Sequence, residues 1–86
     1  MPNSVHVETP DLTSAGALRH QLLDFDSSLA PLKDGRWKVS AEVFSEGHDA
    51  KMEVESILGL VQRWLAAQEI ESTTVQLGTK TYVMLQ

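Results

Sequence analysis

The chain contains no cysteine among its 86 residues. It therefore cannot form disulfides, thiolate metal sites or a cysteine nucleophile, and a small secreted fold held together by disulfides is excluded. Met1 to Val5 shows no basic segment followed by an apolar run, so we expect no signal peptide. No apolar run approaches the roughly 20 residues of a membrane-spanning helix. The sequence predicts a cytoplasmic protein that does not enter a membrane.

Basic residues are also scarce. Seven Lys and Arg stand against twelve Asp and Glu, which gives a formal net charge of -5. Such a chain repels phosphate backbones unless its cations cluster, and here only a loose group surrounds the Asp34-Gly35 pair. We therefore expect no nucleic-acid partner.

The motifs that hold phosphates or expose a serine nucleophile are missing as well. No Gly-x-Gly-x-x-Gly or Gly-x-x-x-x-Gly-Lys loop occurs, and no serine lies in a Gly-x-Ser-x-Gly turn. The sequence predicts no cofactor and no enzymatic activity. Catalysis is the third choice, and it would depend on the pairs His6/Glu8 and His48/Asp49.

What is present is an ordinary globular composition, with 42% hydrophobic and 22% charged residues. A chain of this length forms one domain, which we expect to span residues 1–86. Its single core is modest, so association with a partner would add to its stability.

The first quarter of the chain predicts a strand followed by a helix. Ser4 to Glu8 alternates apolar and polar residues, as a strand with one buried face does. Thr9 is expected to cap a helix that has Pro10 in its first turn and runs to about Asp24. Six residues share the predicted core side of that helix, namely Leu12, Ala15, Leu18, Leu22, Leu23 and Phe25.

A hairpin is expected next. Leu29–Leu32 is a short apolar piece that Pro31 confines to the edge of a sheet. The Asp34-Gly35 pair is typical of tight hairpin turns. Trp37 to Phe44 then alternates more regularly than any other segment, and its polar side should face solvent.

The second half predicts a long helix and a terminal hairpin. Ser45–His48 is expected to form a loop, and the helix should run from Asp49 to Ile70. Thr73–Leu77 and Thr81–Leu85 are typical of two strands joined by a turn at Gly78.

Together these elements predict an α+β fold. The order strand, helix, strand, strand, helix, strand is that of a two-layer ferredoxin-like sandwich, in which two helices cover one face of a mainly antiparallel sheet. An extra strand at the C-terminus is compatible with the pattern. The alternative omits the Leu29–Leu32 strand and still leaves the helices on one face of a small sheet.

The long helix carries more apolar surface than a small sheet needs. Its apolar arc spans roughly 160°, whereas a core-facing stripe needs little more than 100°. The Leu60/Trp64 edge of this arc and the Tyr82/Met84 side of the last strand are therefore predicted to form an interaction surface for a protein partner or for self-association. In the alternative, the last strand covers the Leu60/Trp64 edge within one chain.

A second hypothesis concerns the face of the sheet that the helices leave open. His6, Glu8, Lys38 and Glu42 are expected on that face, where they could bind a small ligand or a metal ion. Any solvated strand face produces the same polar alternation, so the pattern alone does not decide between the two.

Three segments resemble effector-associated constant component domains, small accessory domains of bacterial conflict-type gene clusters. They are Ala17–Leu23, Leu58–Leu65 and Val75–Leu85, which cover less than half of the chain. The resemblance departs at the Gly78-Thr79-Lys80 turn, where a longer Asp-Gly connection is expected. It implies a non-catalytic adaptor and assigns no site residues.

Overall fold

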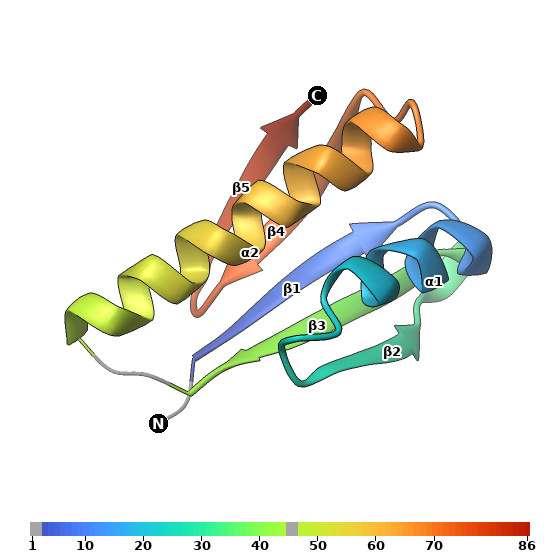
Figure 1. Cartoon of the computed structure of the whole chain (residues 1–86). Helices are drawn as coiled ribbons and strands as arrows, with labels where there is room; N and C mark the ends of the chain where they lie inside the picture. The colour runs from blue at the N-terminus through green and yellow to red at the C-terminus, as the bar shows by residue number, and fades with distance from the viewer. Residues whose placement is uncertain (1–2, 45–46) are drawn as a thin grey trace.

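A computed structural model describes residues 3–44 and 47–86 of the chain. Ser45 and Glu46, which were expected in a loop, lie outside the described residues, as do Met1 and Pro2. The described chain forms a five-stranded antiparallel sheet, and both helices lie on one face of it (Figure 1). The α+β architecture with two helices on one face is therefore confirmed.

The elements follow the predicted order and then add one strand. They are β1 Asn3–Thr9, α1 Leu12–Gln21, β2 Ser27–Pro31, the short 3-10 turn η1 Lys33–Gly35, β3 Trp37–Val43, α2 Gly47–Ala67, β4 Ser72–Leu77 and β5 Lys80–Leu85. Because β5 follows β4, the six-element order is not matched exactly, and the extra C-terminal strand is present. The strands lie side by side in the order β2-β3-β1-β4-β5, so β2 and β5 form the two edges.

The start of α1 differs from the prediction. Asp11 caps this helix, because its carboxylate accepts a hydrogen bond of 2.7 Å from the backbone N–H of Ser14. Thr9 instead belongs to β1, where it is buried and its hydroxyl donates to the carbonyl of Trp37 at 2.9 Å. The prediction of Thr9 as the cap was wrong, since its hydroxyl is used to join β1 to β3.

The end of α1 also comes earlier than predicted. The helix ends at Gln21, and Leu22 adopts a non-helical conformation at its C-cap. Residues after Gln21 no longer follow helical periodicity, so Leu23 is exposed instead of lying in the predicted core. Leu12, in the first turn, is exposed too. The predicted core side holds for Ala15, Leu18 and Leu22, all of which are buried.

The hairpin between β2 and β3 turns at the Asp-Gly pair, as predicted. The connection runs from Leu32 to Arg36, between the register partners Pro31 and Trp37, so it is longer than a two-residue turn. Asp34 and Gly35 lie inside it, and both have positive φ, 63° and 79°. Pro31 lies on the edge strand β2, as expected for a residue without an N–H group.

The core lies between the helices and the sheet. Alternate residues of the three inner strands point into it, and the helices close it from one side. Its fully buried members include Val5, Val7, Leu18, Leu22, Val39, Val43, Ile57, Val61, Trp64, Leu65 and Val75. Neither helix of the described residues covers the other face of the sheet (Figure 1). The polar positions of the alternating β1 and β3 pattern lie on that face.

Candidate functional site

Trp64 does not belong to an interaction surface. Its side chain is only 1% exposed, and its indole N–H donates to the carbonyl of Ser14 in α1 at 2.9 Å. Leu60 is half-buried and packs against the same core. The Leu60/Trp64 edge is thus covered within the chain, and α1 covers part of it. The assignment of Trp64 to a partner surface is corrected, because its polar atom and its ring are both occupied by the fold.

The last strand, β5, carries exposed apolar side chains on both of its faces. Tyr82 is 48% exposed, Val83 67% and Leu85 68%. Met84 is half-buried and packs against the core. Tyr82 and Met84 are opposite Val75 and Thr73 in the β4–β5 register.

Val83 and Leu85 are the surface residues that the predicted site left out. Both point to the open face, because side chains alternate along a strand and Tyr82 points to the helix face. The signal that could have found them is apolar character on both faces of a strand at the sheet edge. β5 is therefore an edge strand with exposed apolar side chains on both sides, which we call the β5 edge.

Three hydrogen bonds hold the end of β5 to the segment around the end of α2. The Gln62 amide donates to the Leu85 carbonyl at 2.8 Å. The Gln86 amide donates to the carbonyls of Leu65, at 3.1 Å, and Ile70, at 3.3 Å. This strand is thus fixed in place even though its outer side has no neighbouring strand.

On the open face, side chains from neighbouring strands form polar pairs. The His6 Nδ1 atom lies 2.7 Å from the Ser40 hydroxyl oxygen. The Glu42 carboxylate accepts from the Ser4 hydroxyl at 2.9 Å. These two pairs join β1 to β3.

Glu8 is bound by a residue other than its cross-strand neighbour. Lys38 is opposite Glu8 in the β1–β3 register. The Glu8 carboxylate nevertheless lies 3.6 Å from a guanidinium nitrogen of Arg36, which follows the η1 turn. The ion pair is half exposed, so its contribution to stability is small.

A hollow of about 300 Å³ lies on this face. Three of the four predicted ligand-site residues, His6, Glu8 and Lys38, line it. The remaining lining residues are Leu32, Thr74, Gln76 and Thr81. Glu42 is not among them. We call this hollow the open-face pocket.

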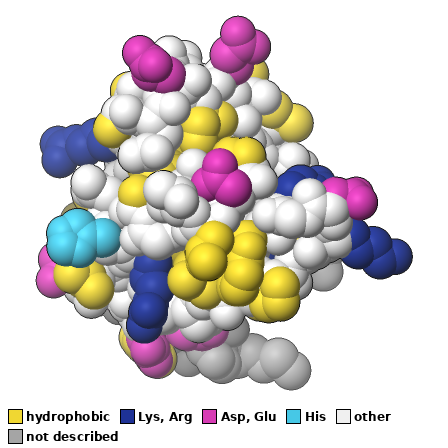
Figure 2. Space-filling model, turned by 90° about the vertical axis from the view of Figure 1, so that its right-hand side faces the viewer, with side chains coloured by type: hydrophobic (Ala, Val, Ile, Leu, Met, Phe, Trp, Pro, Cys, Tyr) yellow, Lys and Arg dark blue, Asp and Glu magenta, His cyan; other side chains and the backbone are white. Residues whose placement is uncertain are grey.

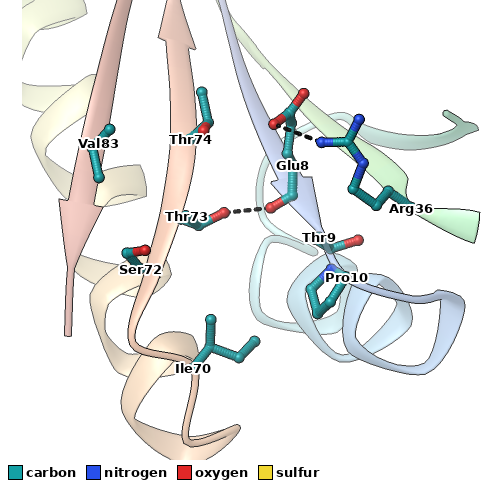
Figure 3. Close-up of a pocket in the computed structure, with 9 residues that line it drawn as sticks. All are labelled: Glu8, Thr9, Pro10, Arg36, Ile70, Ser72, Thr73, Thr74 and Val83. Carbon is teal, nitrogen blue, oxygen red and sulfur yellow. Dashed lines mark hydrogen bonds and ion pairs between the residues drawn. The ribbon is translucent and has the colours of Figure 1, made fainter. Parts of the chain in front are cut away.

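A second hollow of about 290 Å³ adjoins the first and shares Glu8 and Thr74 with it (Figure 3). It opens where β1 and β4 separate, because their pairing ends at Val7 and Val75 although both strands continue. The Thr73 hydroxyl donates to the Glu8 carbonyl across this gap (Figure 3). The Glu8–Arg36 ion pair lies at its other side.

The His6 imidazole has a lowered pKa. Partial burial is the main cause, and the positive charge of Lys38 adds to it, while Glu42 acts in the opposite direction. The neutral imidazole is therefore favoured in the folded state relative to a free histidine.

This shift predicts a loss of stability in mild acid. The ordinary pKa of 6.5 holds for the unfolded chain, so the unfolded state binds more protons than the folded state just below that value. The free energy of unfolding should thus fall as the pH is lowered through 6.5 to the folded pKa. Urea unfolding of the wild type and of His6→Gln, followed between pH 8 and pH 5, measures the effect. The prediction fails if both proteins show the same pH dependence.

The remaining predicted pair lies at the start of α2, which begins at Gly47 rather than at Asp49. His48 and Asp49 are both exposed in the first turn of α2. Within residues 3–44 and 47–86, no group of three or more His, Asp or Glu could hold a metal ion. None of the described helices is long and apolar enough to cross a membrane.

The surface charges are dispersed. On the face drawn in Figure 2, acidic, basic and hydrophobic side chains are interspersed. A basic stripe of the kind that follows a nucleic-acid backbone is not visible on that face.

Comparisons with known proteins yield no relative. No protein-family model matches the sequence, and neither a curated protein nor a solved structure matches it. The resemblance to effector-associated constant component domains therefore stays a prediction.

Proposed function

We propose that this domain is a non-enzymatic interaction module that associates with a second copy of itself through the β5 edge. The observation that carries the proposal is the exposure of Tyr82, Val83 and Leu85 on a strand at the edge of the sheet. Unpaired edge strands with apolar side chains readily accept another strand. A cytoplasmic location and an adaptor role are part of the same proposal.

The fold that we propose for the module is ferredoxin-like, extended by one strand. The first six helices and strands have the βαββαβ order, and β1 lies between β3 and β4. The added strand β5 replaces β4 at the edge. This displacement is what gives the domain an apolar edge.

The two edges of the sheet differ in chemistry. The β2 edge contains Ser27, Ser28 and Pro31, and a proline lacks the N–H that a new strand would need. The β5 edge has no proline, and five of its six residues are uncharged. A partner strand is therefore expected at β5 rather than at β2.

Alternate residues of β5 form hydrogen bonds to β4, and the backbone groups of the residues between them point outward. Two residues, Gly78 and Thr79, connect the closing pair Leu77 and Lys80, and in such hairpins the closing pair is hydrogen-bonded. Alternate residues then face β4, so the backbone groups of Thr81 and Val83 point away from it. The Gln86 N–H donates to the Glu71 carbonyl at 2.8 Å, which fits this phase.

The β5 sequence is self-complementary about Val83. In an antiparallel pair of two β5 strands centred there, the two Val83 residues exchange backbone hydrogen bonds. Tyr82 then lies opposite Met84 of the other copy, and Thr81 lies opposite its Leu85. The Leu85 carbonyl already accepts from Gln62, but a carbonyl oxygen can accept a second hydrogen bond. Apolar side chains thus meet on both faces of the extended sheet.

Sedimentation velocity over a range of concentrations tests the proposal. We expect a monomer–dimer equilibrium for the wild type and at least a roughly tenfold weaker dimer for Val83→Lys, because two like charges would then lie directly opposite each other. Ser28→Lys places the same charge on the β2 edge and should leave the equilibrium unchanged. A monomer at every concentration, or a dimer that Val83→Lys leaves intact, would overturn the proposal.

Cysteine cross-linking tests the register. Because the chain has no cysteine of its own, a single introduced thiol reports on one position only. In the register centred on Val83, the two Cα atoms at this position are about 5.5 Å apart, which allows a disulfide. Mild oxidation should therefore cross-link Val83→Cys efficiently and Tyr82→Cys poorly. The reverse pattern would mean that another register is used.

A further inference from the structure

We propose that the open-face pocket binds the carboxylate of a small monocarboxylate, with Lys38 as its positively charged partner. This site shares Thr81 with β5, but its charged residues lie on β1 and β3, so it does not require self-association. It lies on the face of the sheet that the helices leave uncovered, and four strands contribute to it.

Lys38 has no ion-pair partner among the described residues of the pocket, because Glu8 pairs with Arg36. Arg36 holds the Glu8 carboxylate at 3.6 Å, although Lys38 is its cross-strand neighbour. Among the described residues, no carboxylate lies within ion-pair distance of Lys38. The Glu8 carboxylate is thus paired with Arg36, which leaves the Lys38 ammonium on the wall of the pocket without an ion-pair partner in the described part of the chain.

Neutral hydrogen-bonding groups surround this charge. Thr74 and Thr81, whose side chains carry hydroxyl groups, line the pocket from β4 and β5. The His6 imidazole lines it from β1 and uses Nδ1 for the contact with Ser40, so its other nitrogen is not engaged in that contact. An ammonium group beside hydroxyl donors is complementary to a carboxylate, since each oxygen can accept two hydrogen bonds.

Two features favour a monoanion over a phosphate dianion. The pocket offers a single uncompensated positive charge, and the chain as a whole carries a formal charge of -5. A second negative charge on the ligand would have no second cation beside it, because Lys38 is the one Lys or Arg among the described residues that line the pocket. The volume of about 300 Å³ suits a small molecule rather than a peptide or a nucleotide.

Titration of the isotope-labelled full chain with sodium acetate, sodium propionate or inorganic phosphate tests the proposal. Each titration is followed by amide chemical shifts at constant ionic strength, with sodium chloride as the salt control. We expect saturable shifts at His6, Lys38 and Thr81 with both carboxylates and a Kd on the order of millimolar.

Two variants and one control make the test specific. Lys38→Gln should weaken carboxylate binding about tenfold, and Thr81→Val should weaken it roughly threefold. Lys33→Gln, which removes an exposed lysine outside the pocket, should leave the Kd unchanged. Amide spectra of each variant show whether it keeps its fold, and Thr81 is exposed enough to be replaced without disturbing the core.

Different outcomes of the titrations would contradict the location of the site and the class of its ligand. Absence of saturable shifts, or binding that both pocket variants leave unchanged, would overturn the site. Tighter binding of phosphate than of the carboxylates at these residues would overturn the choice of a monocarboxylate.

Discussion

Trp64→Ala is expected to lower the free energy of unfolding by about 3–5 kcal/mol. The ring is the largest of the fully buried side chains, and its removal leaves a cavity between α1 and α2. The carbonyl of Ser14 also loses the hydrogen bond from the indole N–H. Because domains of this size are stable by only about 5–15 kcal/mol, a large part of the total stability is at stake.

Urea unfolding followed by circular dichroism measures this effect, and Trp64→Phe is the matched control. Phenylalanine keeps most of the buried apolar area and loses the hydrogen bond, so it should cost less than alanine does. A Trp64→Ala protein with wild-type stability but weakened self-association would contradict the structure, because it would place Trp64 at an interface after all.

Val7→Asp is expected to unfold the domain. Val7 lies in the central strand, where its register partners are Val39 on one side and Val75 on the other, and all three side chains are buried. An ionised carboxylate at this position would have no partner, and the cost of burying it is at least several kcal/mol. Loss of the far-ultraviolet circular dichroism signal and collapse of amide shift dispersion would report the unfolding.

Ser28→Asp is the control for this substitution. It introduces the same charge on an exposed position of the edge strand β2, where a change within about 0.5 kcal/mol is expected. A Val7→Asp protein that unfolds cooperatively with near wild-type stability would show that β1 does not occupy the centre of the core.

Much of the fold could be predicted from local pattern. The alternation in Ser4–Glu8 and Trp37–Phe44 predicted β1 and β3, because a half-buried strand requires a period of two. The Asp34-Gly35 pair predicted its hairpin through the positive φ that the turn requires. The start of α1 could not be resolved in the same way. Both Thr9 and Asp11 can cap a helix, and the choice depended on a hydrogen bond from Thr9 to β3.

The candidate sites were predicted in part. Alternation placed His6, Glu8 and Lys38 on the open face, and the four strands β1, β3, β4 and β5 bring them into one pocket together with Thr74 and Thr81. Glu42 was left out because it pairs with Ser4 farther along the strands. The pairing of Glu8 with Arg36 depends on where the η1 turn places the guanidinium, which no spacing in the sequence reveals.

The width of the apolar arc on the long helix could be predicted from the residues. Which partner buries that arc could not be predicted. Helical periodicity fixes which side chains of α2 share a face, because that geometry is local. Whether Trp64 meets another helix or another molecule depends on how α1 packs against α2, and the bond from its indole to Ser14 decides that it is internal.

The sequence by itself determined the elements, their order and the two-sided apolar character of the last strand, since all of these follow from short-range pattern. Only the tertiary structure decided which apolar surface remains exposed. Strand order is set by contacts between residues far apart in the chain, and it places β5 at the edge while α1 covers part of the Trp64 side of α2. On β5 the exposed apolar side chains are those of Tyr82, Val83 and Leu85.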